Sequence, residues 1–153
     1  MNDNATLQKL LIKILNKIII DRFHNELSKN SISHSELSIK AGKSPSAFNK
    51  NFNSCEQLTL ASFLRYSYAA TSLLGNKSIN NQFSLDNLIA RDELKLISMI
   101  CISKDIDLHN FSQEEILFLK HYKVYFDYLK KNNKLTKDEV NCFYNYIIRK
   151  DVF

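Results

Sequence analysis

The stretch from Ser33 to Phe52 limits the possible folds more than any other part of the chain, because it carries start and stop signals for two short helices. Ser33 and Glu36 have the spacing of a capping box, in which a hydroxyl and a carboxylate bind the first free amides of a helix. Gly42 supplies the left-handed residue that ends this helix, where a larger side chain would clash. We therefore expect two helices joined by a tight turn.

The second of these helices has its own start signals. We expect Ser44 to cap it and Pro45 to occupy its first position, where a missing N–H costs nothing. The apolar spacing directs five residues of the pair inward: Leu37, Ala41, Ala47, Phe48 and Phe52. Four polar residues of the second helix are expected outside: Ser46, Asn49, Lys50 and Asn53.

The outward residues have side chains that suit DNA. An Asn amide can donate to and accept from adenine, a Lys reaches guanine or a phosphate, and the free amides at a helix start favour a phosphate. From Lys43 to Asn53 there are two cations and no anion. His34, in the first helix, is expected to face solvent or phosphate. These features predict a helix-turn-helix that offers its second helix to the major groove; the alternative is an ordinary helical hairpin with a solvated outer face.

The run ISHSELSIKAGKSPSAFNKNF from Ile32, followed by FLRYSYA at Phe63 to Ala69, resembles the first helix-turn-helix of AraC/XylS-type transcription regulators. The shared features are the serine opening, the glycine turn, the S-P-S start and the F-x-x-x-F of the recognition helix. The resemblance implies that Ser44, Ser46, Asn49 and Lys50 face the groove and that Arg65 lies near the DNA backbone. The full set of predicted DNA contacts is Ser33, His34, Lys43, Ser44, Ser46, Asn49, Lys50, Asn53 and Arg65.

A second resemblance is to TetR-type repressors. It is carried by A-G-x-S at Ala41 to Ser44 and by F-x-S-x-E-x-L at Phe52 to Leu58. The two resemblances together cover roughly residues 32–74, the middle of the chain.

Composition predicts an all-α protein, because one Pro and two Gly in 153 residues leave few tight turns. The apolar content of 44% is enough for a core. Residues 1–83 hold ten Lys and Arg against five Asp and Glu, whereas residues 84–153 hold eleven of each. We therefore expect a DNA-binding domain over residues 1–83 and a helical dimerisation, partner or effector domain over residues 84–153.

Apolar periodicity and capping signals predict the other helices. They are expected at about residues 5–29, from Ser54 to a stop at Gly75, at 84–102, from Ser112 to about 129, and from Thr136 to about 148. The polar stretch of residues 75–83 is the expected domain boundary, and residues 104–110 are an expected loop. Lys9, Lys13 and Lys17 form a stripe on the first helix. It is interpreted as a solvated face of a core helix, with subunit pairing and a membrane surface as alternatives.

Ten of the 17 Phe and Tyr residues lie between Phe111 and Phe153. This concentration is typical of the core of a small helical domain, and an aromatic subunit interface or an effector pocket remains open. A homodimer is expected because one recognition helix reaches only a few base pairs.

The sequence carries no signal for catalysis, a metal site or a cofactor. His24, His34, His109 and His121 are scattered, and the two glycines cannot form a phosphate-binding loop. Cys55, Cys101 and Cys142 are interpreted as reduced core thiols. No basic segment precedes an apolar run at the N-terminus, and the apolar run from Leu10 to Ile20 is too short to span a bilayer. We expect a cytoplasmic protein that is not an enzyme and does not bind a membrane.

The function predicted from the sequence is sequence-specific binding of double-stranded DNA, as a transcription regulator of a bacterium or mobile element. Activation and repression are not distinguished. The first alternative is a helical interaction protein, an adaptor or anti-regulator that uses the same hairpin to bind protein. The second is an accessory factor in plasmid or phage DNA processing.

Overall fold

The computed structural model describes residues 3–52, 59–75, 82–89, 91–102 and 111–148. In these residues all regular secondary structure is helical, which confirms the all-α prediction. The chain forms two compact units, one of residues Asn16–Asp92 and one of Met1–Leu15 with Glu93–Phe153. The first helix, α1 (Asp3–Lys29), supplies residues to both units.

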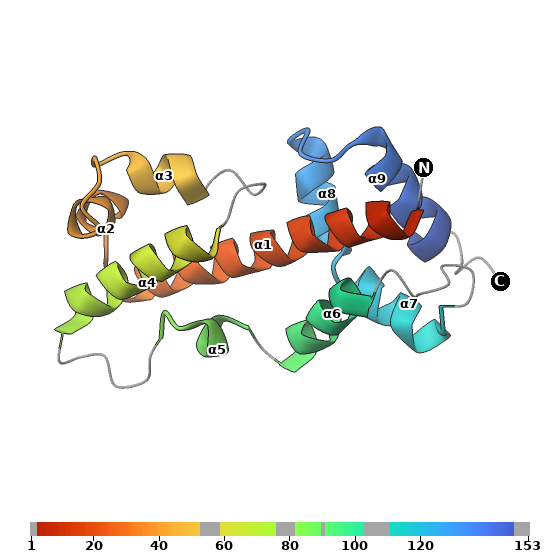
Figure 1. The fold of residues 1–153 in the computed structure, drawn as a ribbon, viewed down its shortest axis with the longest axis horizontal. Coiled ribbons are helices and arrows are strands. Elements are labelled where there is room, and N and C mark those ends of the chain that lie inside the picture. Colours follow the sequence, from red (N-terminus) through yellow and green to blue (C-terminus); the bar gives the residue numbers. More distant parts are fainter. Residues whose placement is uncertain (1–2, 53–58, 76–81, 90, 103–110, 149–153) are drawn as a thin grey trace. The chain divides into compact units, whose positions relative to one another are not determined.

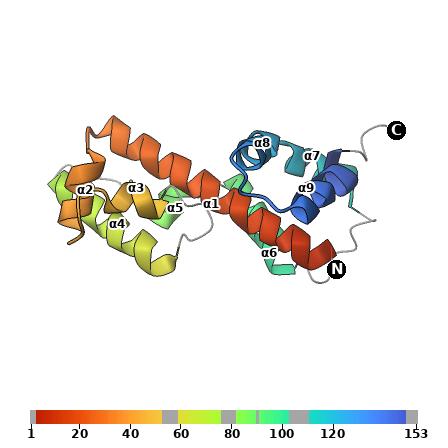
Figure 2. The ribbon, with the colours of Figure 1, turned by 90° about the horizontal axis from the view of Figure 1, so that it is seen from above.

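The unit Asn16–Asp92 is built around aromatic side chains. Its helices besides α1 are α2 (His34–Lys40), α3 (Ala47–Phe52), α4 (Leu60–Leu74) and α5 (Leu85–Leu88). Figure 1 shows α2 and α3 on one side of α4, with α5 on the other, and Figure 2 shows α3 above α4. The buried Phe23 ring of α1 lies 5.8 Å from the Phe48 ring, 6.2 Å from Phe63 and 5.1 Å from Phe83. Phe23 therefore joins α1, α3 and α4 in one core.

The limits of this unit differ from the predicted domain of residues 1–83. Phe83 is fully buried against Phe23, and Arg22 Nη1 donates a hydrogen bond to the Leu88 carbonyl at 2.8 Å. These contacts bring α5 into the unit. The first 15 residues of α1 instead belong with the C-terminal helices.

Helix α4 begins at Leu60, with the Thr59 hydroxyl accepting the Ser62 N–H at 3.1 Å. The predicted start was Ser54; the Ser54 and Gln57 capping box and Cys55 lie outside the described residues. Gly75 ends α4 with φ +57°, as predicted. Most of the predicted boundary, residues 76–81, also lies outside the description.

The other unit contains the N-terminal part of α1 and five helical segments. They are α6 (Arg91–Ile102), α7 (Gln113–Lys120), α8 (Lys123–Lys131), α9 (Lys137–Phe143) and a π-helix, η3 (Tyr144–Ile148). The box at Ser112 and Glu115 is complete, and the Thr136 hydroxyl accepts the Glu139 N–H, so both predicted helix starts are confirmed. The predicted loop at residues 104–110 lies outside the described residues.

Two helices predicted as continuous are interrupted. The helix expected over residues 84–102 ends at Ile89, whose backbone is extended at φ −106° and ψ 113°. The helix expected from Ser112 to about residue 129 breaks at His121 and Tyr122. Tyr122 has φ −93° and ψ 8°, and its ring is buried.

Aromatic side chains form much of the core of this second unit. Phe111, Tyr122, Phe126 and Phe143 are buried, and the Phe126 and Phe143 rings stack at 4.1 Å. The core interpretation therefore holds for these four. Of the predicted lysine stripe, Lys9 is exposed, whereas Lys13 and Lys17 form ion pairs with Glu139 and Asp21. Lys9 is therefore the one lysine of the predicted stripe that is exposed.

Candidate nucleic-acid interface

The turn between α2 and α3 is fixed by two backbone hydrogen bonds. Gly42, with φ +76°, donates to the Ile39 carbonyl at 2.9 Å, and Lys43 donates to the Ser38 carbonyl at 2.9 Å. This pair of bonds is the Schellman motif, which reverses the chain after a helix. The predicted left-handed role of Gly42 is confirmed.

The Ser38 hydroxyl ties the two helices together. Its side chain is fully buried, donates to the His34 carbonyl at 2.8 Å and accepts the Phe48 N–H at 2.9 Å. One of the free amides at the start of α3 is thereby satisfied from α2. Sequence reasoning missed this residue, although its spacing from Leu37 and Ala41 places it on the inward face of α2.

Phe48 anchors α3 in the core. Its ring is fully buried and lies 5.1 Å from Tyr66 on α4 and 5.8 Å from Phe23 on α1. The inward positions of Phe48 and Leu37 are confirmed, and Ala41 and Ala47 are half-buried. The side chain of Phe52 lies outside the described residues.

The start of α3 was predicted wrongly. The helix begins at Ala47, and Ser44 and Pro45 precede it in a turn closed by the Ala47 N–H and the Ser44 carbonyl at 3.0 Å. The first bond of helical spacing runs from the Lys50 N–H to the Ser46 carbonyl at 3.2 Å. The three-residue spacing of the first bond is that of a turn, and the four-residue spacing of the second is that of an α-helix. Pro45 therefore lies in the turn before α3 and not at the first position of the helix.

Most predicted contact residues are exposed along this turn and helix. Those exposed from the turn onward are Lys43, Ser44, Ser46, Asn49 and Lys50. Ser33 is exposed at the start of α2, and its hydroxyl accepts the Glu36 N–H at 3.1 Å. Arg65 is exposed on α4, and Asn53 lies outside the described residues. The structure thus brings five of the nine together on α3 and the turn before it.

His34 lies differently from the solvent- or phosphate-facing position that sequence suggested. Its half-buried ring packs 4.9 Å from the Phe48 ring and 4.9 Å from the His24 ring. Its Nδ1 lies 2.6 Å from Asn49 Oδ1, and the ring nitrogen donates there because an amide oxygen only accepts. His34 therefore occupies one of the two lone pairs of Asn49 Oδ1.

Burial lowers the pKa of His24 below its ordinary value of 6.5, and the neighbouring His34 lowers it further. Asp21 acts in the opposite direction and Lys17 in the same one. His24 is therefore harder to protonate than a free imidazole.

Metal-binding clusters are absent from the part of the chain that the structure describes. No three His, Cys, Asp or Glu side chains there are placed to hold a metal ion. Burial raises the pKa of the Cys142 thiol to about 12, with the Asp3 and Glu139 carboxylates adding to the shift. Such a thiol stays protonated and is a poor nucleophile.

No helix among the described residues combines the length and apolarity needed to cross a membrane. Comparisons with protein-family models, with curated proteins and with solved structures find no match to this chain.

Proposed function

We propose that the unit Asn16–Asp92 is a helix-turn-helix module and that the protein is a sequence-specific, double-stranded-DNA-binding transcription regulator of a bacterium or mobile element. One observation carries the proposal: α3 buries Phe48 on one side and exposes Asn49 and Lys50 on the other, and Ser46 is exposed in the turn just before it. The Gly42 turn and the Ser38 hydroxyl hold α3 in this orientation against α2.

The chemistry of the exposed side fits a duplex. Lys40, Lys43 and Lys50 are exposed on α2, the turn and α3, and Glu36 is the one exposed carboxylate from Ser33 to Lys50. Lys50 can bind guanine or a phosphate, and the Ser46 hydroxyl can bind either base or backbone. The sequence resemblance to AraC/XylS-type regulators supports the same assignment. In this proposal α2 crosses the backbone while α3 enters the major groove.

The proposal includes a homodimer. One recognition helix contacts only a few base pairs, so tight and selective binding needs two half-sites about one helical turn apart. The unit formed by residues 93–153 with the start of α1 has its own core, and we assign dimerisation or partner binding to it.

The decisive experiment is footprinting of the full chain on the DNA upstream of its own gene, followed by binding to the protected duplex over a range of salt. About five phosphate contacts predict a log–log slope of affinity on salt of roughly −4 to −5. Absence of any protected site, together with no duplex binding at low salt, would refute the proposal.

A second candidate function, binding to a protein partner, is favoured by a different surface. Leu60, Leu64 and Tyr68 are spaced four residues apart on α4 and are 69%, 55% and 77% exposed. Such a stripe on one helix face is typical of a helix that docks against another protein. If duplex binding fails, a partner protein that binds the wild-type chain but not the L64Q variant supports this alternative.

A further inference from the structure

The side chain of His34 is held in place at the start of α2. Its ring lies 4.9 Å from the buried Phe48 ring and 4.9 Å from the ring of His24 on α1. Its carbonyl oxygen accepts the Ser38 hydroxyl at 2.8 Å, and the oxygen of that hydroxyl accepts the Phe48 N–H. Packing therefore fixes the ring of His34, and hydrogen bonds fix its backbone relative to α3.

From this position His34 determines which way the carboxamide of Asn49 points. His34 Nδ1 donates to Asn49 Oδ1 at 2.6 Å. An imidazole can donate from Nδ1 in both its neutral and its protonated form, so the bond does not depend on the charge of the ring. A carboxamide held by its oxygen cannot exchange its oxygen and nitrogen without breaking this bond. Oδ1 is therefore tied to α2, and Nδ2 with its two N–H groups forms the other end of the amide.

An amide fixed in this way distinguishes adenine from guanine. In the major groove adenine presents the N6 donor beside the N7 acceptor, whereas guanine presents two acceptors, O6 and N7. Asn49 Nδ2 can donate to N7 of adenine, and the lone pair of Oδ1 that His34 leaves can accept from N6. With guanine, Oδ1 would face O6, and two acceptors repel each other. An amide free to turn could donate to O6 instead and would tolerate guanine.

We propose that His34 is a positioning residue that makes Asn49 a reader of adenine and rejects guanine at one base pair of the target. This inference rests on the proposed function, because it names the base that α3 reads. The exposed Asn49 contacts the base, and His34 acts only through Asn49.

The first test needs no DNA. In alkaline buffer, where imidazoles are neutral, the nitrogen-15 shifts of the His34 ring in the full-length protein show which nitrogen carries the proton. We expect the proton on Nδ1. We also expect the H34F variant to lower the order parameter of the Asn49 side-chain amide. A proton on Nε2 alone would overturn the proposal, because Nδ1 would then accept and the amide of Asn49 would point the other way.

The second test measures base discrimination on the duplex that the full chain protects in footprinting. Each A·T pair of the protected site is replaced in turn by G·C, and the ratio of the two affinities is the readout. N49A should bring this ratio close to one at the pair that Asn49 reads. H34F keeps a ring beside Phe48 but has no donor, so it should lower the ratio there at least fivefold and change the others less than twofold. If N49A changes no ratio, Asn49 is not a reader of adenine and the proposal fails.

A matched pair of variants separates the hydrogen bond from packing. Asn and Leu have similar shapes, and both lack the imidazole ring, but only Asn offers an N–H close to the position of Nδ1. H34N should keep the adenine-to-guanine ratio within threefold of the wild type, whereas H34L should lose as much as H34F. Equal losses in H34N and H34L would assign the effect to packing and overturn the proposal.

The double variant H34F/N49A tests whether His34 acts through Asn49. In the N49A background the change of His34 to Phe should alter the ratio less than twofold, because the amide that it positions is already gone. A further loss of discrimination at the same pair would mean that His34 contacts the base itself. That outcome contradicts a positioning role.

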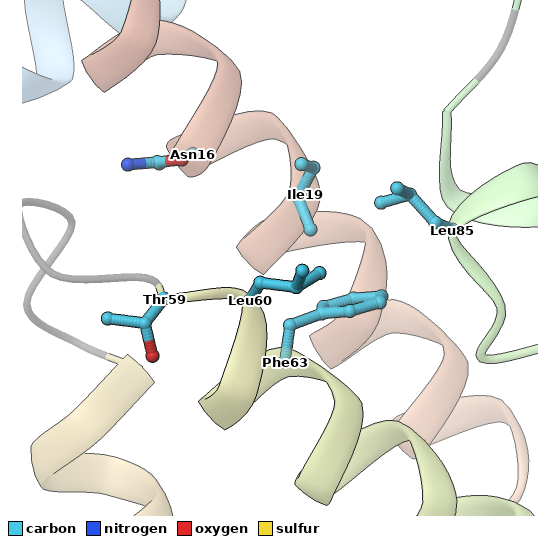
Figure 3. A pocket seen from close by; sticks show the side chains of 6 residues that line it. All are labelled: Asn16, Ile19, Thr59, Leu60, Phe63 and Leu85. Carbon is cyan, nitrogen blue, oxygen red and sulfur yellow. The ribbon is translucent and has the colours of Figure 1, made fainter.

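A control for lost stability lies in another part of the same unit. Ile19 is 6% exposed and lies at a hollow of about 190 Å³ whose lining comes from α1, α4 with the residue before it, and α5. Figure 3 shows this lining: Asn16, Ile19, Thr59, Leu60, Phe63 and Leu85. I19V removes one buried methyl group, which lowers stability, and should leave the ratio within twofold of the wild type. A fall as large as that of H34F would mean that discrimination follows general stability, and it would overturn the role of His34.

Failure of this inference differs from failure of the proposed function. If the wild-type chain binds no duplex, the proposed function fails and the reading of adenine fails with it. If the chain binds a duplex and N49A lowers one ratio while H34F lowers none, the proposed function stands and the role of His34 alone is refuted.

Discussion

At the scale of single residues, a ring and a hydroxyl set the position of α3. Phe48 places its ring among Phe23, Tyr66 and His34, and Ser38 binds the Phe48 N–H from α2. On the opposite side of α3, Asn49 bonds to His34 of α2, and both Asn49 and Lys50 are exposed. A change in Phe48 or Ser38 should therefore disturb the outer surface indirectly.

Replacing Phe48 with Ala should lower the free energy of unfolding by about 3–5 kcal/mol, because it empties a fully buried site. Urea denaturation followed by circular dichroism measures this loss. L64A is the control: its side chain is 55% exposed, so we expect a change within about 0.5 kcal/mol. Equal stability of F48A and the wild type would mean that the ring is not part of the core.

His24 predicts a pH dependence of stability. Its pKa in the folded protein lies below the ordinary 6.5, mainly because the half-buried ring is partly removed from water. The unfolded chain therefore binds the proton more readily than the folded chain in this window. Stability should be complete above pH 6.5 and should fall as the pH drops from there toward the lowered pKa.

The urea midpoint, measured at several pH values on either side of 6.5, checks this expectation, with H24Q as the comparison. H24Q should show a smaller decline in acid than the wild type. An identical decline in both proteins would assign the effect to other groups.

At the scale of elements, the turn after α2 depends on one left-handed residue. Gly42 has φ +76°, and a Cβ built on it meets no atom within 4 Å. The cost of G42A is therefore conformational alone, about 1–2 kcal/mol. Gly75, with φ +57°, ψ −129° and the same open surroundings, is a second strained glycine at the end of α4, where an alanine should cost at least as much.

G42A and G75A should both lose stability in urea, but only G42A should also weaken duplex binding, since only Gly42 lies between α2 and α3. A loss of duplex affinity of equal size in both variants would indicate a general effect of instability. It would also contradict the role assigned to the hairpin turn.

Helix starts were predictable where the signal is local. Ser112 and Thr136 cap their helices as their spacing to Glu115 and Glu139 indicates. The break at Tyr122 was not predictable, because no glycine or proline marks it in the sequence. Pro45 was misplaced because a turn and a first helical turn share the same residue preferences.

The candidate interface was predictable in outline. Outward positions on α3 follow from the spacing around Phe48, and Asn49 and Lys50 are exposed as expected. The inward contacts of His34 and Ser38 depend on the angle at which α2 packs, which periodicity gives only roughly. Spacing from Leu37 places both residues on the inward face of α2, but it does not show which side chains they contact.

At the scale of the whole molecule, α1 serves two cores. Phe23 near its C-terminal end packs with Phe48 and Phe63, whereas Lys13 forms a 2.8 Å ion pair with Glu139 in the other unit. An apolar face running along all of α1 does not show where one core ends and the next begins. The predicted domain boundary at residue 83 therefore differs from the limits of the observed units.

Replacing Lys13 with Met should destabilise the protein by about 3–5 kcal/mol, because it leaves the buried Glu139 carboxylate without its cation. The double variant K13M/E139Q should recover most of the loss, since it removes the buried charge. Urea unfolding of both variants measures the difference. Failure of the second change to restore stability would mean that the loss has another cause, such as lost packing of the lysine stem.

The measurement that tests the central claim most directly is the salt dependence of duplex affinity for K50A beside K131A. Lys50 is exposed on α3, and Lys131 is exposed at the end of α8 in the other unit. If Lys50 contacts a phosphate, K50A should reduce the log–log slope by about 1 and weaken binding to all duplexes; if it reads guanine, it should cost about 1–3 kcal/mol on the specific site. K131A should match the wild type in both respects. Affinity and slope unchanged by K50A would contradict a DNA-facing α3.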